Sequence, residues 1–263
     1  MDLGITGRRA FVSGSTQGIG YAIARALLEE GALVTINGRS EARVAQAVAR
    51  LRTVVAGGRV DGVAGDLADG AEATELIGRI GDVDILVNNV GLFEVKPFDQ
   101  TTDEDWQRFF DANVMSGVRL SRHLLPGMLS RGDGRVIFIS SESGVNVPAD
   151  MVHYGMTKAA MLAVANGLAK LTAGTAVTVN TVLGGPTYSD GVRQTVAQLA
   201  SAQAVGEADL KAAIIGQNRT SLLQRFIEPD EIADLVRYLA SPRSVATNGA
   251  ALRADGGVLT TVL

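Results

Sequence analysis

The feature that most constrains the fold is a regular alternation along the chain of short apolar runs with longer Ala- and Leu-rich segments. The runs around residues 84–87 and 136–139 are almost continuously apolar, which is typical of strands buried on both faces of a sheet. Strands that alternate with helices predict an α/β fold with a parallel sheet and helices on both faces. We expect strands at 9–13, 33–37, 60–64, 83–88, 135–140, 176–182 and 250–254.

Helices are expected between these strands, for instance over 20–31, 41–55, 103–131 and 151–172. No Pro- or Ser-rich linker, low-complexity tract or convincing repeat divides the sequence, so we expect a single domain over 1–263. The stretch 187–224 follows a Gly-Gly-Pro turn and is rich in Ala and Gln. It is expected to form helical pieces and to act as a flap over a site at the strand ends.

Composition excludes several classes of function. The net charge is −4 and there is no basic run, which argues against a nucleic-acid partner. The chain has no cysteine, and His123 and His153 form no ligand motif, so no metal site is expected. We see no secretory leader and no apolar run long enough to cross a bilayer. A cytoplasmic protein without a membrane partner is the expectation.

A glycine-rich turn follows the first expected strand and opens the first expected helix. Its glycines allow a tight turn, and the helix N-terminus offers free N–H groups to a phosphate. Taken alone, the three glycines of this turn are also compatible with an ordinary strand-to-helix turn. The residues expected to contact a dinucleotide here are Gly14, Ser15, Thr16, Gln17, Gly18, Ile19 and Gly20.

Further motifs follow in order, and with the glycine turn they resemble the short-chain dehydrogenase/reductase (SDR) family over nearly the whole chain. They are Asn88-Asn89-Val90-Gly91, Asn113, Ser141, the Tyr-x-x-x-Lys pair Tyr154 and Lys158, and Asp255-Gly256-Gly257. The resemblance is to ketoacyl reductase-like members with a Ser/Tyr/Lys/Asn active site. It implies a Rossmann-type, doubly wound parallel sheet of about seven strands. It also implies a homotetramer.

Three positions depart from the family pattern. Ser13 stands where Thr is usual, and Val90 stands where Ala is usual. Gly184 replaces the first proline of the family's Pro-Gly-Pro-Thr turn, which we expect to loosen the turn at the nicotinamide end.

The candidate catalytic residues suit the reduction of a carbonyl, which needs a hydride, a proton and a group that stabilises charge on oxygen. Tyr154 can supply the proton, although the pKa of a free phenol is about 10. Lys158 lies one helical turn further on the same face, so its charge is expected to lower that pKa. Ser141 can hydrogen-bond the substrate oxygen. By the resemblance, Lys158 also binds the nicotinamide ribose, and Asn113 holds a water in a proton relay.

The residues at the end of the second expected strand bear on whether NAD(H) or NADP(H) is bound. NAD-specific relatives carry an acidic residue where this chain has Gly38, and Arg39 and Ser40 could bind a 2′-phosphate instead. Gln17 stands where NADP-binding relatives often carry a basic residue, which weakens the case. NADP(H) is favoured and NAD(H) stays possible. By the resemblance, the remaining dinucleotide contacts are Asp66, Leu67, Asn88, Val90, Gly91, Tyr154, Lys158, Gly185 and Thr187.

The sequence thus predicts an oxidoreductase that transfers a hydride between NADP(H) and a small-molecule carbonyl or secondary alcohol, with Tyr154 as general acid/base. The alternatives are an NAD(H)-dependent alcohol dehydrogenase and a catalytically silent nucleotide-binding protein of the same fold. A carbon–carbon double-bond reductase is disfavoured, because those relatives separate Tyr and Lys more widely. The residues expected to wall the substrate pocket are Phe93, Glu142, Ser143, Val145, His153, Pro186 and Tyr188.

Overall fold

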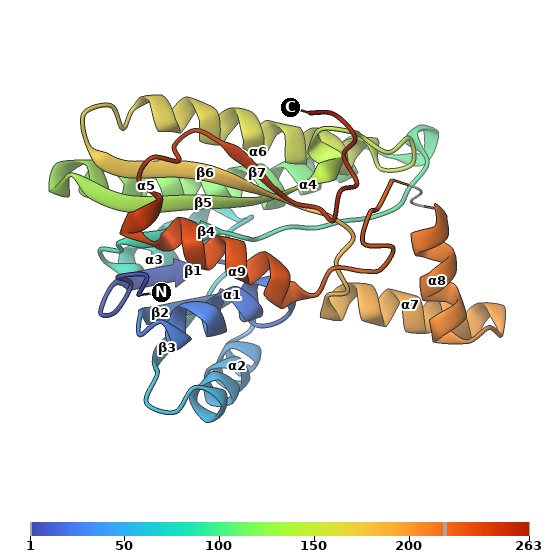
Figure 1. Ribbon diagram of the computed structural model, residues 1–263, viewed down its shortest axis with the longest axis horizontal. Helices are drawn as coiled ribbons and strands as arrows, with labels where there is room; N and C mark the ends of the chain where they lie inside the picture. The colour runs from blue at the N-terminus through green and yellow to red at the C-terminus, as the bar shows by residue number, and fades with distance from the viewer. Residues whose placement is uncertain (1, 218–219, 263) are drawn as a thin grey trace.

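The computed structural model describes residues 2–217 and 220–262. Its described part contains a seven-stranded parallel sheet of order β3-β2-β1-β4-β5-β6-β7. The order reverses between β1 and β4, which is the switch point of a doubly wound fold. The expected Rossmann-type α/β class is therefore confirmed (Figure 1). The strands are β1 Arg9–Val12, β2 Leu33–Gly38, β3 Arg59–Ala64, β4 Ile85–Asn88, β5 Asp133–Ser141, β6 Ala176–Gly184 and β7 Ala251–Ala254.

Helices cover both faces of this sheet. They are α1 Gly18–Glu29, α2 Glu41–Val54, α3 Gly70–Ile80, α4 Asp103–Phe110, α5 Ser116–Arg131, α6 Val152–Lys170, α7 Asp190–Gln203, α8 Glu207–Gln217 and α9 Pro229–Ala240. One apolar layer joins the sheet to α1, α2 and α9, and a second joins it to α3, α5 and α6. In the described part of the chain, no helix is long and apolar enough to span a membrane.

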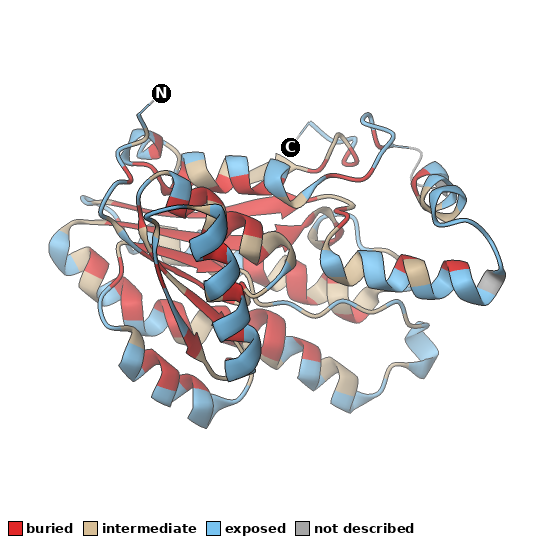
Figure 2. Cartoon of the chain, turned by 90° about the horizontal axis from the view of Figure 1, so that it is seen from below, coloured by how far each residue is buried: buried red, intermediate tan, exposed pale blue. Residues whose placement is uncertain are grey.

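The continuous apolar runs are explained by side chains that alternate between these two layers. In β4, Ile85 and Val87 belong to the first layer, whereas Leu86 belongs to the second. In β1, Phe11 likewise faces the second layer. Figure 2 shows the resulting concentration of buried residues along the strands and the inward sides of the helices. Both faces of a central parallel strand must be apolar, which is why the sequence pattern is unbroken.

The helix expected over 103–131 is not continuous. A π-helical turn, Asp111–Met115, separates α4 from α5. Asn113 lies within this turn, and its side-chain amide bonds the backbone of Leu92 and the hydroxyl of Thr157. These are long-range contacts that periodicity in the sequence does not reveal, and π turns of this kind are frequent near functional sites.

The predicted flap contains two helices, α7 and α8, which extend beyond the edge of the sheet (Figure 1). They pack on a small apolar cluster of their own, formed by Tyr188, Val196, Ile215 and Phe226. An isolated bridge between Thr187 and Ile227 joins the base of this segment. The expected helical pieces are therefore present, and residues 218 and 219 of the predicted flap lie outside the described residues.

A pair of glycine variants tests the packing beneath the site. A Cβ on Gly144 would lie 2.8 Å from the backbone carbon of Lys158, whereas a Cβ on Gly167 of α6 meets no atom within 4 Å. Gly144→Ala should lower the free energy of unfolding by about 1–3 kcal/mol through overpacking. Gly167→Ala should raise it by about 0.5–1 kcal/mol, because alanine loses less entropy in a helix. Urea unfolding measures both changes, and equal stability of the two variants would contradict this account.

Candidate active site

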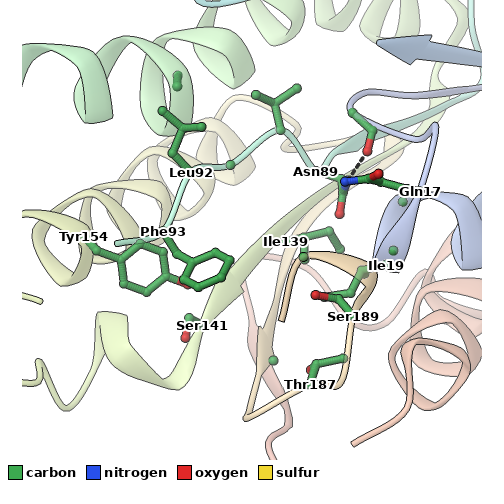
Figure 3. A pocket seen from close by; sticks show the side chains of 18 of the residues that line it. Gln17, Ile19, Asn89, Leu92, Phe93, Ile139, Ser141, Tyr154, Thr187 and Ser189 are labelled. Atoms are coloured by element: carbon green, nitrogen blue, oxygen red, sulfur yellow. Dashed lines mark hydrogen bonds between the residues drawn. The ribbon is translucent and has the colours of Figure 1, made fainter. Parts of the chain in front are cut away.

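A cavity of about 1340 Å³ runs along the carboxyl ends of the strands. The loops that follow β1, β2, β3, β4, β5 and β6 all contribute to its lining. Ligands of open α/β sheets bind at this edge, beside the switch point. Figure 3 shows Gln17, Ile19 and Asn89 toward one end of the cavity, and Tyr154, Phe93 and Ser141 toward the other.

The glycine turn forms one wall of this cavity. Gly14 and Gly18 have φ of +59° each, a conformation that favours glycine. A Cβ on Gly20 would lie 2.5 Å from both the Gly14 carbonyl oxygen and the Asn89 Nδ2. The backbone N–H of Gly18 donates to the carboxylate of Asp190, in the flap, at 2.7 Å. The N-terminus of α1 is therefore already an anion-binding position in this structure.

Two of the predicted cofactor residues do not line the cavity. Ser15 is fully buried, and its hydroxyl donates to the Val12 carbonyl oxygen at 2.5 Å. Asn88 is also buried and donates through Nδ2 to the Ser121 hydroxyl at 3.2 Å. The neighbouring Asn89 lines the cavity instead. Alternation along β4 carries the signal, because Asn88 shares the face of Leu86, which packs toward α5.

The asparagine amide of Asn89 holds the glycine turn in place. Its Nδ2 donates to the carbonyl oxygens of Ser13 at 3.1 Å and Gly14 at 2.9 Å. The Ser13 hydroxyl in turn accepts from the Asn89 N–H at 2.9 Å. The turn and the loop after β4 are therefore fixed to one another.

The end of β2 presents basic side chains. A Cβ on Gly38 would lie 2.6 Å from the Thr16 Cγ2, so an acidic side chain has no room here unless Thr16 moves. Arg39 and Ser40 line the cavity, and so does Arg43, which was not among the predicted cofactor contacts. Arg43 lies in the first turn of α2, and its position four residues after Arg39 was the available signal. Asp66 and Leu67 line the same region, as expected.

Lys158 is buried in α6, close to the cavity. Its Nζ donates to the Ile139 carbonyl oxygen at 3.0 Å, which is its one hydrogen bond to the described residues. Burial lowers the pKa of Lys158 to about 8. The Lys158 ammonium lines the cavity and still has N–H donors that are not hydrogen-bonded to the described residues. It is therefore suited to bind hydroxyl groups such as those of a ribose.

Tyr154 and Ser141 stand together at this end of the cavity (Figure 3). Burial raises the pKa of Tyr154 to about 12, and the neighbouring Ser141 side chain offsets only part of this rise. The Lys158 Nζ lies 5.6 Å from the centre of the Tyr154 ring. The expected lowering of the tyrosine pKa by Lys158 is thus wrong for this structure, because desolvation of the phenolate is the larger effect.

Asn113 stands behind the cavity and does not line it. Its Oδ1 accepts from the Leu92 N–H at 2.6 Å, and its Nδ2 donates to the Leu92 carbonyl oxygen at 3.0 Å and to the Thr157 hydroxyl at 2.8 Å. The side chain therefore fastens the loop after β4 to α6, which is a structural contact that the sequence did not predict.

The residues expected to wall the substrate pocket divide into two groups. Phe93, Glu142, Ser143 and Pro186 line the cavity, together with Leu92, Met151 and Val192, which were not predicted. Three others do not line it. His153 is buried against Phe109 and Trp106, Tyr188 packs against Phe226, and Val145 is exposed.

Gly184 ends a paired strand, so the segment that we expected to be a loosened turn begins only after it. Gly184 is the last residue of β6 and pairs with both Ser141 of β5 and Ala254 of β7. A Cβ on the next residue, Gly185, would lie 2.5 Å from the Asp255 carbonyl oxygen. Strand pairing on both sides holds this segment where the family uses a proline. Gly185 and Thr187 both line the cavity, as expected.

Comparison with known proteins agrees with this geometry. A family model described as short chain dehydrogenase matches residues 8–200. The chain is 45% identical over 263 residues to the uncharacterized oxidoreductase YvaG of Bacillus subtilis (strain 168), covering 100% of both. It is 31% identical over 265 residues to the 3-oxoacyl-(acyl-carrier-protein) reductase FabG of Vibrio cholerae serotype O1, covering 97% of this chain and 99% of that relative.

A solved structure extends the comparison to three dimensions. The L-sorbose reductase of Gluconobacter frateurii, complexed with NADPH and L-sorbose, matches with a TM-score of 0.94 and 31% identity, over 100% of each chain. With the family match and the relatives above, this makes the chain a member of the short-chain dehydrogenase/reductase family, an NAD(P)-dependent oxidoreductase that acts on CH–OH or C=O groups.

Proposed function

We propose that the protein transfers a hydride between NADP(H) and a carbonyl or secondary alcohol, with Tyr154 as the general acid/base. The observation that carries this proposal is the convergence of Tyr154, Ser141 and Lys158 on one end of a cavity whose other end is the glycine turn. The convergence supplies a proton donor, an oxygen-binding hydroxyl and a cation beside a phosphate-binding helix terminus.

The cavity fits a phosphorylated dinucleotide. The glycine turn would hold the pyrophosphate, Arg39, Ser40 and Arg43 would bind the 2′-phosphate, and Lys158 would bind ribose hydroxyls. When bound there, the nicotinamide would supply the hydride. The absence of an acidic side chain at Gly38 favours NADP(H) over NAD(H), and the related L-sorbose reductase is complexed with NADPH.

The protein's own residues would bind the substrate oxygen, donate the proton and stabilise the phenolate that results. Ser141 would hold the substrate oxygen beside Tyr154. The raised pKa of Tyr154 keeps its phenol protonated at neutral pH, which is the form that carbonyl reduction needs. Loss of that proton to the substrate leaves a phenolate, and the ammonium of Lys158 would stabilise it. Asn113 would act by positioning α6 rather than by contact with the reacting groups.

The proposal includes the arrangement of the chain. Residues 1–263 would act as a single dinucleotide-binding domain, with 187–224 as a flap over the cavity. Ser189, Gly191 and Val192 of that segment already line it. Family membership supports a homotetramer as the working assembly.

Replacing Tyr154 by phenylalanine tests the general acid. Tyr154→Phe should retain affinity for NADPH but lower kcat for carbonyl reduction by roughly 10²–10⁴. Tyr238→Phe is the matched control, because Tyr238 is 42% exposed on α9 and does not line the cavity. Comparable rates in wild type and Tyr154→Phe would remove this mechanism. Equal NADPH binding with no turnover of any ketone by wild type would favour a silent nucleotide-binding protein.

Removing the arginines at the end of β2 tests the cofactor preference. Arg39→Ala and Arg43→Ala should each raise the Kd for NADPH roughly tenfold and leave that for NADH nearly unchanged, because only NADPH carries the 2′-phosphate. Titration of nicotinamide fluorescence measures both constants. Arg79→Ala, at an exposed position of α3, is the control. Equal losses for the two nucleotides would show that the arginines do not read the phosphate.

The pKa of Lys158 predicts how carbonyl reduction depends on pH. Below pH of about 8 the amine is charged and can stabilise the phenolate that forms on Tyr154. Above that pH the charge is lost, so kcat/KM for reduction should fall with an apparent pKa near 8. Lys158→Arg keeps its charge at every accessible pH and should abolish this decline, even if its rate is lower. A wild-type profile that is flat from neutral pH to well above that pKa would contradict the assignment.

A further inference from the structure

Glu142 places a carboxylate in the same cavity as Ser141 and Tyr154. It opens the short 3₁₀ helix Glu142–Gly144 directly after β5. Within the described residues, no Lys, Arg or His lies within ion-pair distance of this carboxylate. Burial raises the pKa of Glu142, and the charge of Asp255 adds to that effect. A partly buried carboxylate without a cation needs hydrogen-bond donors to offset its desolvation.

Two serine hydroxyls meet part of that need. Ser141 Oγ donates to the Glu142 Oε2 at 2.9 Å, and Ser143 Oγ donates to the same oxygen at 2.6 Å. The other oxygen, Oε1, accepts no hydrogen bond from the described residues. It is also not among the fully buried side-chain polar atoms of these residues that lack a hydrogen-bond partner. The carboxylate therefore keeps acceptor capacity that a ligand in the cavity can use.

The position of this acceptor relative to the reacting oxygen is fixed by Ser141. Its hydroxyl donates to Glu142, and Tyr154 stands at the same end of the cavity. A substrate carbonyl oxygen that accepts the Ser141 proton would release Glu142 Oε2 from its bond to Ser141, and the carboxylate beside it would then have more acceptor capacity. Glu142 is therefore the charged acceptor next to the serine that would bind the reacting oxygen.

We propose that Glu142 is a specificity-determining residue that accepts a hydrogen bond from a hydroxyl on the carbon adjacent to the reacting carbon. The substrate class is then α-hydroxy ketones and the corresponding vicinal diols, as in ketoses and polyols, rather than simple acyl chains. This inference rests on the proposed function, because it takes Ser141 and Tyr154 as the groups that bind the reacting oxygen.

The alternatives fit the cavity less well. An alkyl or acyl chain would cover the carboxylate without giving it a donor, and a buried polar group left unpaired carries a full desolvation penalty. A substrate ammonium would pair with Glu142, but it would share the cavity with the cation of Lys158. A neutral hydroxyl satisfies the carboxylate without that repulsion.

Two ketones that differ by one hydroxyl test the inference. The kcat/KM with NADPH would be measured for 1-hydroxy-2-butanone and for 2-butanone, in wild type, Glu142→Ala and Glu142→Gln. Wild type should prefer the hydroxy ketone by roughly 10- to 10²-fold, the range expected for one hydrogen bond to a charged group. Glu142→Ala should lose most of this preference by reacting more slowly with the hydroxy ketone alone. Glu142→Gln, which preserves shape, should lose part of it.

A structural effect of the substitution would lower both rates together, so the ratio of the two is the informative quantity. Glu75→Ala, at an exposed position of α3, is the matched control and should keep the wild-type ratio. Equal kcat/KM for the two ketones in wild type, or a preference that persists in Glu142→Ala, would overturn the inference. So would a Glu142-dependent preference for 1-amino-2-butanone over the hydroxy ketone, which would make the site a cation site.

Binding to the NADP⁺-loaded enzyme separates this inference from the proposed function. Calorimetric titration with 1,2-butanediol and with 2-butanol should show tighter binding of the diol, and Glu142→Ala should remove the difference. Diol-selective binding without turnover of either ketone would support the hydroxyl site and reject the proposed hydride transfer. Turnover of both ketones without selectivity would support hydride transfer and reject the role of Glu142.

Discussion

The site depends on the close packing of the glycine turn against the loop after β4, at the switch point of the sheet. A Cβ on Gly20 would lie 2.5 Å from atoms of Gly14 and Asn89, so the turn can approach the loop only because this position is glycine. The loop continues to Leu92, whose backbone is bonded by Asn113, and Asn113 also bonds Thr157 of α6. Because α6 carries the candidate acid and its lysine, the backbone of the loop after β4 and the hydrogen bonds at its two ends join the phosphate-binding turn to the catalytic helix.

The flap is attached to the same turn by a charged contact. Asp190, the first residue of α7, accepts a hydrogen bond from the Gly18 N–H, at the positive end of the α1 dipole. A phosphate favours the same N–H donors for the same electrostatic reason. An anion that binds there must share these donors with the carboxylate or replace it, and two like charges in contact repel. The contact between Gly18 and Asp190 would therefore compete with a phosphate at the turn.

The sequence predicts those parts of this molecule that depend on local patterns. Continuous apolar runs predict the central strands because both faces of β4 and β5 are buried, and the glycine turn is predicted by its position after β1. The π-helical turn at Asn113 could not be predicted, because it is fixed by Leu92 and Thr157, which lie far away in the sequence. The exchange of Asn88 for Asn89 was predictable in principle from strand alternation. The direction of the Tyr154 pKa was not, since it depends on burial rather than on the spacing to Lys158.

Burial acts in one direction on the three titratable groups at the reacting end of the cavity. It raises the pKa of Tyr154 and of Glu142 and lowers that of Lys158, so each group is shifted toward its uncharged form. A cavity of this kind gains little from a ligand that brings a further charge to the same place, because that charge is desolvated too. It gains from a ligand that brings hydroxyls, which can donate to a carboxylate and accept from an ammonium or a phenol without desolvating an ion. Neutral hydroxyl groups would therefore suit this end of the cavity better than a further charge, which is the premise of the proposal for Glu142.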